Sequence, residues 1–347
     1  MKNDSSNDNI IKRSLISSIA FIILVVIVFY FIFRDNNYRE VYGIYKDSKR
    51  AYLLVAVFCM SSFSICEAIN LKISLNLLKE KATFRNCYKY ALAGFFVAGI
   101  TPSSSGGDPM QLYLMTQDKI KVSNGALTLL LKLLCFQLTV VFLAVIGFIS
   151  SHKLFLQSLG HLRYIIYLGA FLNILVGTLY FLIIFCKPIV VYLVELLSKL
   201  FHKLHIKKAD QIVETINVQV EEYSKAATYI KKNKRVLIKM FLVTLTQMIL
   251  YYSIPYFVYL SLGFNTNSIF TFIALQSVLF VSVSSLPFPG AVGVSEATFM
   301  RIYRQMFPKQ ILGSAMVITR FINFYIFIVY SGVALMYYIL KHNFNKR

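Results

Sequence analysis

The sequence predicts an all-α, polytopic membrane protein. We expect a helical bundle of about six full spans plus two opposed re-entrant helical hairpins, as in inverted-repeat transporters. Hydrophobic residues make up 57% of the 347 residues, and charged residues only 15%. Several apolar stretches exceed the roughly 18 residues needed to cross a hydrocarbon core about 30 Å thick. Two apolar stretches are interrupted by short segments rich in Pro, Gly and Ser.

The first expected span is "RSLISSIAFIILVVIVFYFIF", at 13–33. Its apolar run is too long for a secretory signal, and no small-residue cleavage site follows, so we expect a retained helix. The remaining expected spans meet the same length criterion. They are 51–75, 123–150, 163–186, 236–262 and 310–340.

The two interrupted segments each predict a re-entrant hairpin. "TPSSSGGDP" follows a short apolar stretch and precedes a brief helix, which gives a first hairpin at 87–116. "PFPGAVGVSE" has the same setting and gives a second hairpin at 267–306. Neither arm of the first hairpin is long enough to cross the membrane. A full span for 267–286 is the alternative for the second.

The distribution of Lys and Arg orients the chain. The densest positive cluster lies in 187–235, which is therefore expected in the cytoplasm, whereas "GFNTNS" at 263–268 carries no charge and suits the outside. This places a multi-pass protein in the cytoplasmic membrane, with both termini in the cytoplasm. The cationic loop 34–50 is then external. The first hairpin enters from the cytoplasm, and the second enters from outside.

The chain therefore divides into an N-terminal membrane half (1–186), a cytoplasmic amphipathic connector (187–235) and a C-terminal membrane half (236–347). The connector has apolar residues at helical spacing, which is typical of a helical hairpin lying on lipid headgroups. A partner-docking surface is the alternative. The net charge of +21 predicts contact with anionic inner-leaflet lipids rather than with nucleic acid.

The first break has residues that suit a turn at membrane depth. Non-helical backbone is tolerated there only when it is packed in protein or faces a polar cavity. Gly106 and Gly107 allow positive φ and close approach, and Asp108 is suited to N-cap the next helix with Pro109 at its first position.

The second break repeats this arrangement. Gly290 and Gly293 permit the turn, Ser295 is suited to cap the new helix, and Glu296 falls in its first turn. Each half thus has a helix N-terminus in the membrane interior that carries one carboxylate. Helix N-termini favour an anion such as phosphate, while a carboxylate favours a cation. Together they predict a site for a zwitterionic or cationic phospholipid headgroup. The alternative is that Asp108 and Glu296 are only caps.

Other residues are expected to complete this substrate site. Lys132 and Arg320 lie within spans and are candidate partners for the two carboxylates or for a lipid phosphate; Glu67 is a third intramembrane charge. Structural ion pairing is the alternative. Further candidates are the backbone donors of the two breaks, Ser103, Ser104, Ser105, Gly106, Gly107, Gly290 and Gly293. Side-chain amides that could line the same cavity, or join helices, are Asn70, Gln137, Gln247, Gln276 and Asn323.

The sequence contains few signals of catalysis. It has no P-loop, nucleophile elbow or HExxH motif, and His202 and His205 have no further metal ligands nearby. We therefore expect no cofactor, no metal and no catalytic residue.

The two breaks resemble the motifs of the lysylphosphatidylglycerol synthase transmembrane-region family, the membrane part of bifunctional aminoacyl-phospholipid synthase/flippases. That family shows "TP…GGEP" and "P-x-PGG-x-G-x-x-E" segments, matched here by "TPSSSGGDP" and "PFPGAVGVSE". Arg320 matches a basic residue of the last span. The chain departs from the pattern at Asp108, usually Glu, and at Ala291, usually Gly. Serines also replace an arginine before the glycines.

The resemblance implies a lipid flippase that moves lysyl-phosphatidylglycerol or another phospholipid between leaflets, a role linked to antibiotic resistance. Since the sequence ends at Arg347, shortly after its last span, we expect no soluble synthase domain. One alternative is a phosphatidylglycerol lysyltransferase that uses lysyl-tRNA. Another is a non-transporting membrane partner of a separate lipid synthase. The sequence is also compatible with a homo-oligomer.

Overall fold

The computed structural model describes residues 38–101, 104–150, 162–186, 227–229, 231–284 and 293–344, with isolated positions between 188 and 195. Every regular element within these residues is a helix, which confirms the all-α membrane fold. The expected span 13–33 and most of the connector 187–235 lie outside the described residues.

Five of the expected spans are present as long apolar helices. Four are single helices, and the fifth is a continuous run of two α-helices around a π-helical turn. They are α3 (Arg50–Leu77), α6 (Val122–Ser150), α8 (Leu162–Phe185), α11 (Lys234–Ser261) and the run α14 (Lys309–Arg320), η4 (Phe321–Tyr325) and α15 (Ile326–Phe344).

Helices α3 and α11 lie antiparallel along their full length. The Lys49 N–H donates to the Ser261 carbonyl at 2.8 Å at one end, and Asn70 Nδ2 donates to Thr244 Oγ1 at 2.9 Å nearer the other. Residue numbers therefore rise along one helix as they fall along the other. The C-terminal end of α3 and the C-terminal end of α11 lie at opposite ends of the bundle.

Both interrupted segments form helical hairpins. The first consists of α4 (Phe84–Ile100) and α5 (Gly107–Gln117), and the second of α12 (Ile269–Val283) and α13 (Val294–Ile302). At about 1.5 Å per residue, each arm is shorter than a hydrocarbon core of about 30 Å. Thr83 Oγ1 caps α4, and Ser268 Oγ caps α12, so each first arm begins at a defined residue.

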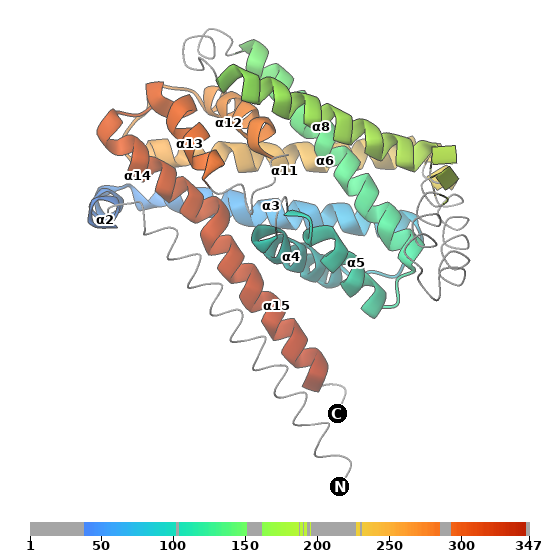
Figure 1. Cartoon of the computed structure of the whole chain (residues 1–347). Coiled ribbons are helices and arrows are strands. Elements are labelled where there is room, and N and C mark those ends of the chain that lie inside the picture. The colour runs from blue at the N-terminus through green and yellow to red at the C-terminus, as the bar shows by residue number, and fades with distance from the viewer. Residues whose placement is uncertain are drawn as a thin grey trace, which may run out of the picture.

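The two hairpins enter the bundle from opposite ends. The α4–α5 hairpin is inserted between the end of α3 and the start of α6, whereas α12–α13 is inserted between the end of α11 and the start of α14. Because α3 and α11 are antiparallel, these insertion points lie at opposite ends, as Figure 1 shows. This opposed arrangement is the predicted one. The side of the membrane that each hairpin faces remains a prediction.

Packing holds each hairpin in place. At the base of the first, Asp118 Oδ2 accepts hydrogen bonds from Lys89 Nζ at 2.6 Å and from Tyr90 OH at 2.5 Å. The second packs through aromatic rings, with Phe272 centred 4.9 Å from Tyr259 of α11. Each hairpin is therefore anchored to the bundle by its own contacts.

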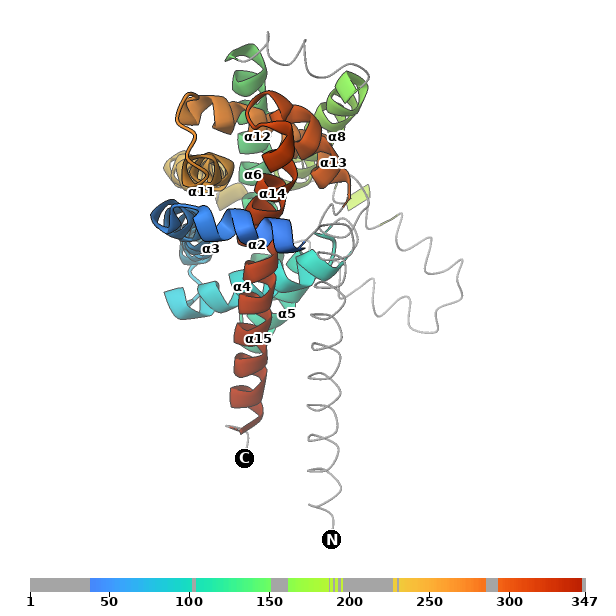
Figure 2. The ribbon, with the colours of Figure 1, turned by 90° about the vertical axis from the view of Figure 1, so that its left-hand side faces the viewer.

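The expected external loop 34–50 contains a helix, α2 (Tyr38–Asp47). Val41 and Ile44, three residues apart, pack against the main apolar core, which explains why this charged segment is helical rather than a loop. At the other end of the chain, α15 packs on α4 and extends past the rest of the bundle (Figure 2).

Candidate functional site

A cavity of about 690 Å³ lies where the two hairpins meet. Residues of both contribute to its wall: Ser104 and Asp108 from the first hairpin, and Gln276 and Ser295 from the second. Long helices α3, α6, α8, α11 and α14 supply the rest. Ligand pockets in proteins have about this volume.

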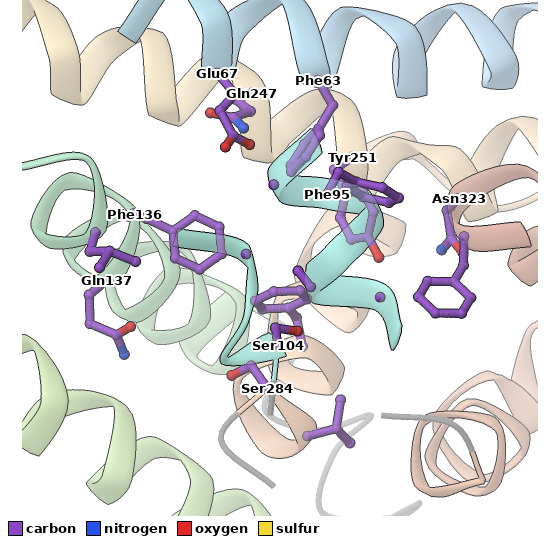
Figure 3. A pocket seen from close by; sticks show the side chains of 18 of the residues that line it. Phe63, Glu67, Phe95, Ser104, Phe136, Gln137, Gln247, Tyr251, Ser284 and Asn323 are labelled. Atoms are coloured by element: carbon purple, nitrogen blue, oxygen red, sulfur yellow. The ribbon is translucent and has the colours of Figure 1, made fainter. Parts of the chain in front are cut away.

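The wall combines aromatic rings with side-chain amides. The rings of Phe63, Phe95, Phe136 and Tyr251 surround the space in Figure 3. Four of the five side-chain amides considered from the sequence line the cavity, namely Gln137, Gln247, Gln276 and Asn323. The fifth, Asn70, does not; it joins α3 to α11 through Thr244, as the alternative interpretation expected.

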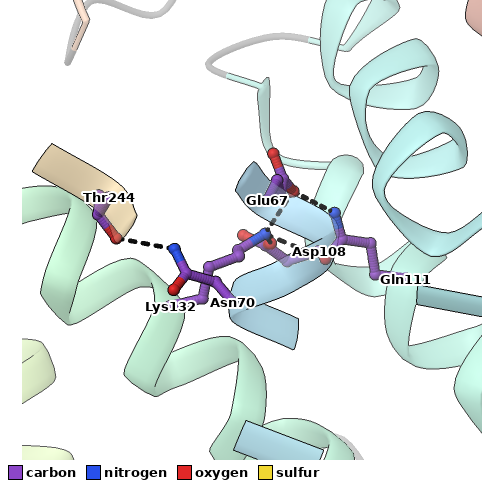
Figure 4. A network of polar contacts seen from close by, with 6 residues as sticks. All are labelled: Glu67, Asn70, Asp108, Gln111, Lys132 and Thr244. Atoms are coloured by element: carbon purple, nitrogen blue, oxygen red, sulfur yellow. Dashed lines mark hydrogen bonds and ion pairs between the residues drawn. The ribbon is translucent and has the colours of Figure 1, made fainter. Parts of the chain in front are cut away.

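Lys132 is the centre of a polar network in the first half (Figure 4). Its Nζ donates to Asp108 Oδ1 at 2.7 Å, to Gln111 Oε1 at 3.0 Å and to Glu67 Oε1 at 3.2 Å. Gln111 Nε2 in turn donates to Glu67 Oε1 at 2.7 Å. Three helices of the first half, α3, α5 and α6, therefore converge on one ammonium group.

Arg320 and Glu296 form the corresponding pair in the second half. Arg320 Nε lies 2.8 Å from Glu296 Oε1, and the guanidinium lies 4.8 Å from the ring centre of Phe324. Glu296 Oε2 also accepts the Gly293 N–H at 2.5 Å. The π-helical turn η4 starts directly after Arg320 and contains Asn323 and Phe324, which line the cavity. Wide turns of this kind are frequent at functional sites.

The two halves repeat one arrangement. In each, a carboxylate in the first turn of the second hairpin arm pairs with a cation on the next long helix. The separation along the chain is 24 residues for both Asp108–Lys132 and Glu296–Arg320. Lys132 and Arg320 thus each form an ion pair with one of the two carboxylates, a geometry that fits both the expected countercharge role and the alternative of structural ion pairing.

The capping roles predicted for Asp108 and Ser295 are wrong. Helix α5 starts at Gly107 after the N-cap residue Gly106, and α13 starts at Val294 after Gly293, so both side chains lie inside the first turn. Asp108 is drawn to Lys132 instead. An ion pair with a buried ammonium group is a stronger interaction than a cap, which contributes about 1 kcal/mol.

The glycines of the first break allow the predicted close approach, but the predicted positive φ is wrong. Gly106 has φ −84°, and the left-handed residue of this turn is Ser104, with φ 56°. Gly107 is required for close approach, because a Cβ there would lie 2.9 Å from the Gly94 carbonyl oxygen. Thr101 Oγ1 accepts the Gly106 N–H at 3.0 Å and so closes the turn. In the second break, Gly293 has φ 86°, as expected.

Five of the predicted substrate-site residues on the hairpins line the cavity: Ser104, Ser105, Gly107, Asp108 and Ser295. The cations Lys132 and Arg320 line it too. Gly106 and Gly293 do not, and their amides are used within the protein. Glu296 does not line the cavity but contacts two residues that do, Arg320 and Ser295. Ser103 and Gly290 lie outside the described residues.

Several polar residues that line the cavity are absent from the predicted set, among them Glu67, Gln111, Asn173 and Thr244. Glu67 was noticed in the sequence as an intramembrane charge without an assigned partner. Gln111 and Asn173 are buried amides, and Asn173 Nδ2 donates to the Val281 carbonyl at 3.0 Å, which ties α8 to the second hairpin. In the sequence, these residues could have been found as polar residues within otherwise apolar stretches.

Two comparisons with known proteins agree with this architecture. The chain matches the family model described as "Lysylphosphatidylglycerol synthase TM region" over residues 16–331. It is also similar to a UPF0104 membrane protein of Archaeoglobus fulgidus, with 24% identity over 333 residues that cover 94% of this chain and 98% of the relative. The match to the family model extends across both hairpins and the cavity between them, so this membrane protein belongs to the lysylphosphatidylglycerol synthase transmembrane-region family.

Proposed function

We propose that the protein is a lipid translocase that passes a phospholipid headgroup between leaflets through this cavity. One observation carries the proposal: two hairpins that enter from opposite ends of the bundle line a single cavity and bring one carboxylate–cation pair each. Opposed hairpins around a central polar site are a common architecture for alternating access.

The cavity has the groups that a phospholipid headgroup requires. Arg320 can contact a phosphate, while Glu67 and Asp108 can contact an amine. The aromatic wall can hold the glycerol and the first methylene groups, with the acyl chains left in the bilayer. Family membership favours an aminoacyl-phospholipid such as lysyl-phosphatidylglycerol. Another phospholipid or a polyprenyl-linked lipid is the alternative cargo.

Reconstitution in liposomes tests the proposal. Acyl-labelled lysyl-phosphatidylglycerol, phosphatidylglycerol and phosphatidylcholine would be compared, with the outer-leaflet label removed chemically to follow translocation. We expect Asp108→Asn and Glu296→Gln to slow transport at least about tenfold, which corresponds to about 1.4 kcal/mol. Glu80→Gln is the matched control, because Glu80 does not line the cavity and accepts a hydrogen bond from Asn124.

Two outcomes would contradict the proposal. If no labelled lipid moves faster than in protein-free liposomes, the chain is not a translocase of these lipids. If both carboxylate variants transport as fast as the wild type, the carboxylate pairs are structural only. Lysyl transfer from lysyl-tRNA, measured with the same purified protein, would support the lysyltransferase alternative instead.

A further inference from the structure

The cavity has two ion-paired groups, Glu67–Lys132–Asp108 in the first half of the protein and Glu296–Arg320 in the second, which we call the two half-sites. Their carboxylates and cations are not equal in number. Glu296 forms an ion pair with Arg320, whereas Lys132 is shared by Glu67 and Asp108. Among the described residues, the two ion-paired groups thus contain three carboxylates and two cations. The excess carboxylate lies in the first half.

Lys132 has no capacity left for a further acceptor. An ammonium group has three donor hydrogens, and Lys132 Nζ already contacts three acceptor oxygens, on Glu67, Asp108 and Gln111. The two carboxylates, in contrast, have oxygens to spare. Within the described part of the chain, no hydrogen bond reaches Glu67 Oε2 or Asp108 Oδ2, and both residues line the cavity.

The other helices around the cavity do not supply the missing cation. The described residues of α4, α12 and α13 that line the cavity include no titratable side chain. The remaining elements contribute Tyr180 from α8, Tyr251 from α11 and Arg320 from α14, of which only Arg320 is a cation, and Glu296 neutralises it. Lys72, the next cation on α3 after Glu67, does not line the cavity.

We propose that the Glu67–Lys132–Asp108 cluster is a proton site that exchanges its proton for the cationic group of a ligand. An uncompensated charge inside a membrane is costly, and two carboxylates that share one site tend to keep one proton between them. The link to cargo rests on the proposed translocase function, whereas the proton site itself does not.

The exchange conserves charge. When an ammonium group of a lipid headgroup enters, the carboxyl O–H bond breaks, its electron pair stays on the carboxylate, and water takes the proton. One positive charge enters as one leaves, so the net charge of the cavity is unchanged. When the headgroup departs, the carboxylate takes a proton back from water. If the two steps occur on opposite sides of the membrane, a proton gradient can drive the lipid.

Infrared difference spectroscopy on the purified full chain tests the proton site directly. We expect a carboxylic-acid C=O band that titrates with pH and is lost in Glu67→Gln or in Asp108→Asn. Glu80→Gln is the matched control, because Glu80 does not line the cavity and accepts a hydrogen bond from Asn124, so this variant keeps the band. A wild-type protein without a titrating carboxylic-acid band, or a band that persists in both Glu67→Gln and Asp108→Asn, would overturn the proposal.

Lipid titration tests the exchange. We expect added lysyl-phosphatidylglycerol, the probe with ammonium groups, to abolish the band and to release about one proton per protein into a weakly buffered solution. Phosphatidylglycerol, which has no ammonium group, should do neither. A band unaffected by lysyl-phosphatidylglycerol would overturn the exchange step. Because the band is read without transport, a protein that shows it but moves no lipid in liposomes would refute the translocase function and leave the proton site intact.

Discussion

Lys132 Nζ lies 2.7 Å from Asp108 Oδ1, and this ion pair joins the second arm of the first hairpin to the helix that follows it. Arg320 and Glu296 make the same connection in the second half at the same chain separation of 24 residues. The two halves of the protein therefore share the positions of their ion-paired side chains as well as the order of their helices. It indicates that the two half-sites are versions of one structural unit placed in opposite orientations.

Lys132→Met should destabilise the protein strongly. It removes the only cation in contact with Glu67 and Asp108 among the described residues, and breaking a buried ion pair costs about 3 kcal/mol or more. Because the chain has no Trp, circular dichroism during thermal unfolding is the suitable measurement. Adding Asp108→Asn to Lys132→Met should restore part of the lost stability. A single variant as stable as the wild type would show that the network is not structural.

The Arg320–Glu296 pair should show a smaller, measurable coupling. A double-mutant cycle with Arg320→Met and Glu296→Gln isolates the pairwise contribution, which we expect to be about 1 kcal/mol, since polar contacts in membrane proteins are modest on average. The free energy of unfolding in mixed detergent would be measured for all four proteins. Strict additivity of the two substitutions would argue against a direct interaction.

Gly94→Ala should disturb the first half-site from outside the ion pair. A Cβ at Gly94 overlaps the side-chain amide of Gln111, which bridges Glu67 and Lys132. Overpacking of this kind costs about 1–3 kcal/mol. Gly313→Ala on α14 is the control, since no atom lies within 4 Å of the added Cβ, and it should be neutral or slightly stabilising. Equal melting temperatures for the two variants would refute the overlap.

The base of the first hairpin should depend on Asp118. Asp118→Asn weakens the contacts with both Lys89 and Tyr90 and should cost about 1–2 kcal/mol, whereas Tyr90→Phe removes one hydroxyl and should cost about 1 kcal/mol. Hydrogen exchange of α4 and α5 should rise in the same order. Tyr113→Phe, at an exposed position of α5, serves as the control. Unchanged exchange in Asp118→Asn would show that these contacts do not hold the hairpin.

Cysteine labelling should place the bases of the two hairpins on opposite sides of the membrane. Lys81 and Asn265 are exposed residues in the connections that precede the first and second hairpins. With the five native cysteines replaced, a membrane-impermeant maleimide should label Lys81→Cys only from the side assigned to the cytoplasm and Asn265→Cys only from the other side. Labelling of both from one side would contradict the opposed arrangement.

The helical architecture could be predicted from the sequence because it depends on local properties of the chain. The length of an apolar run determines whether it can span, and the Pro and Gly residues at 101–109 and 287–296 interrupt runs that would otherwise continue. A charge within a span requires a partner, so the sequence makes Lys132 and Arg320 candidate partners for the two carboxylates or for a lipid phosphate.

The remaining features depend on contacts between distant segments. Glu67 and Gln111 are 44 residues apart and meet only because α3 and α5 both pack around Lys132. The capping prediction failed for the same reason, since a local role for Asp108 competes with a tertiary ion pair that the sequence does not reveal. The left-handed residue was misplaced because Ser104, rather than a glycine, adopts the positive φ.

The π-helical turn η4 determines how α15 is rotated about the helix axis relative to α14. A wide turn holds one residue more than an α-helical turn, and one residue corresponds to about 100° of rotation. Deleting one residue from Phe321–Tyr325 would convert it to an ordinary α-helical turn and rotate α15 relative to α14. Phe327 and Ile328, which contact Phe95 and Gly99 of the first hairpin, would then turn away while Arg320 kept its place. A single surplus residue thus allows one helix to serve the second half-site and pack against the first.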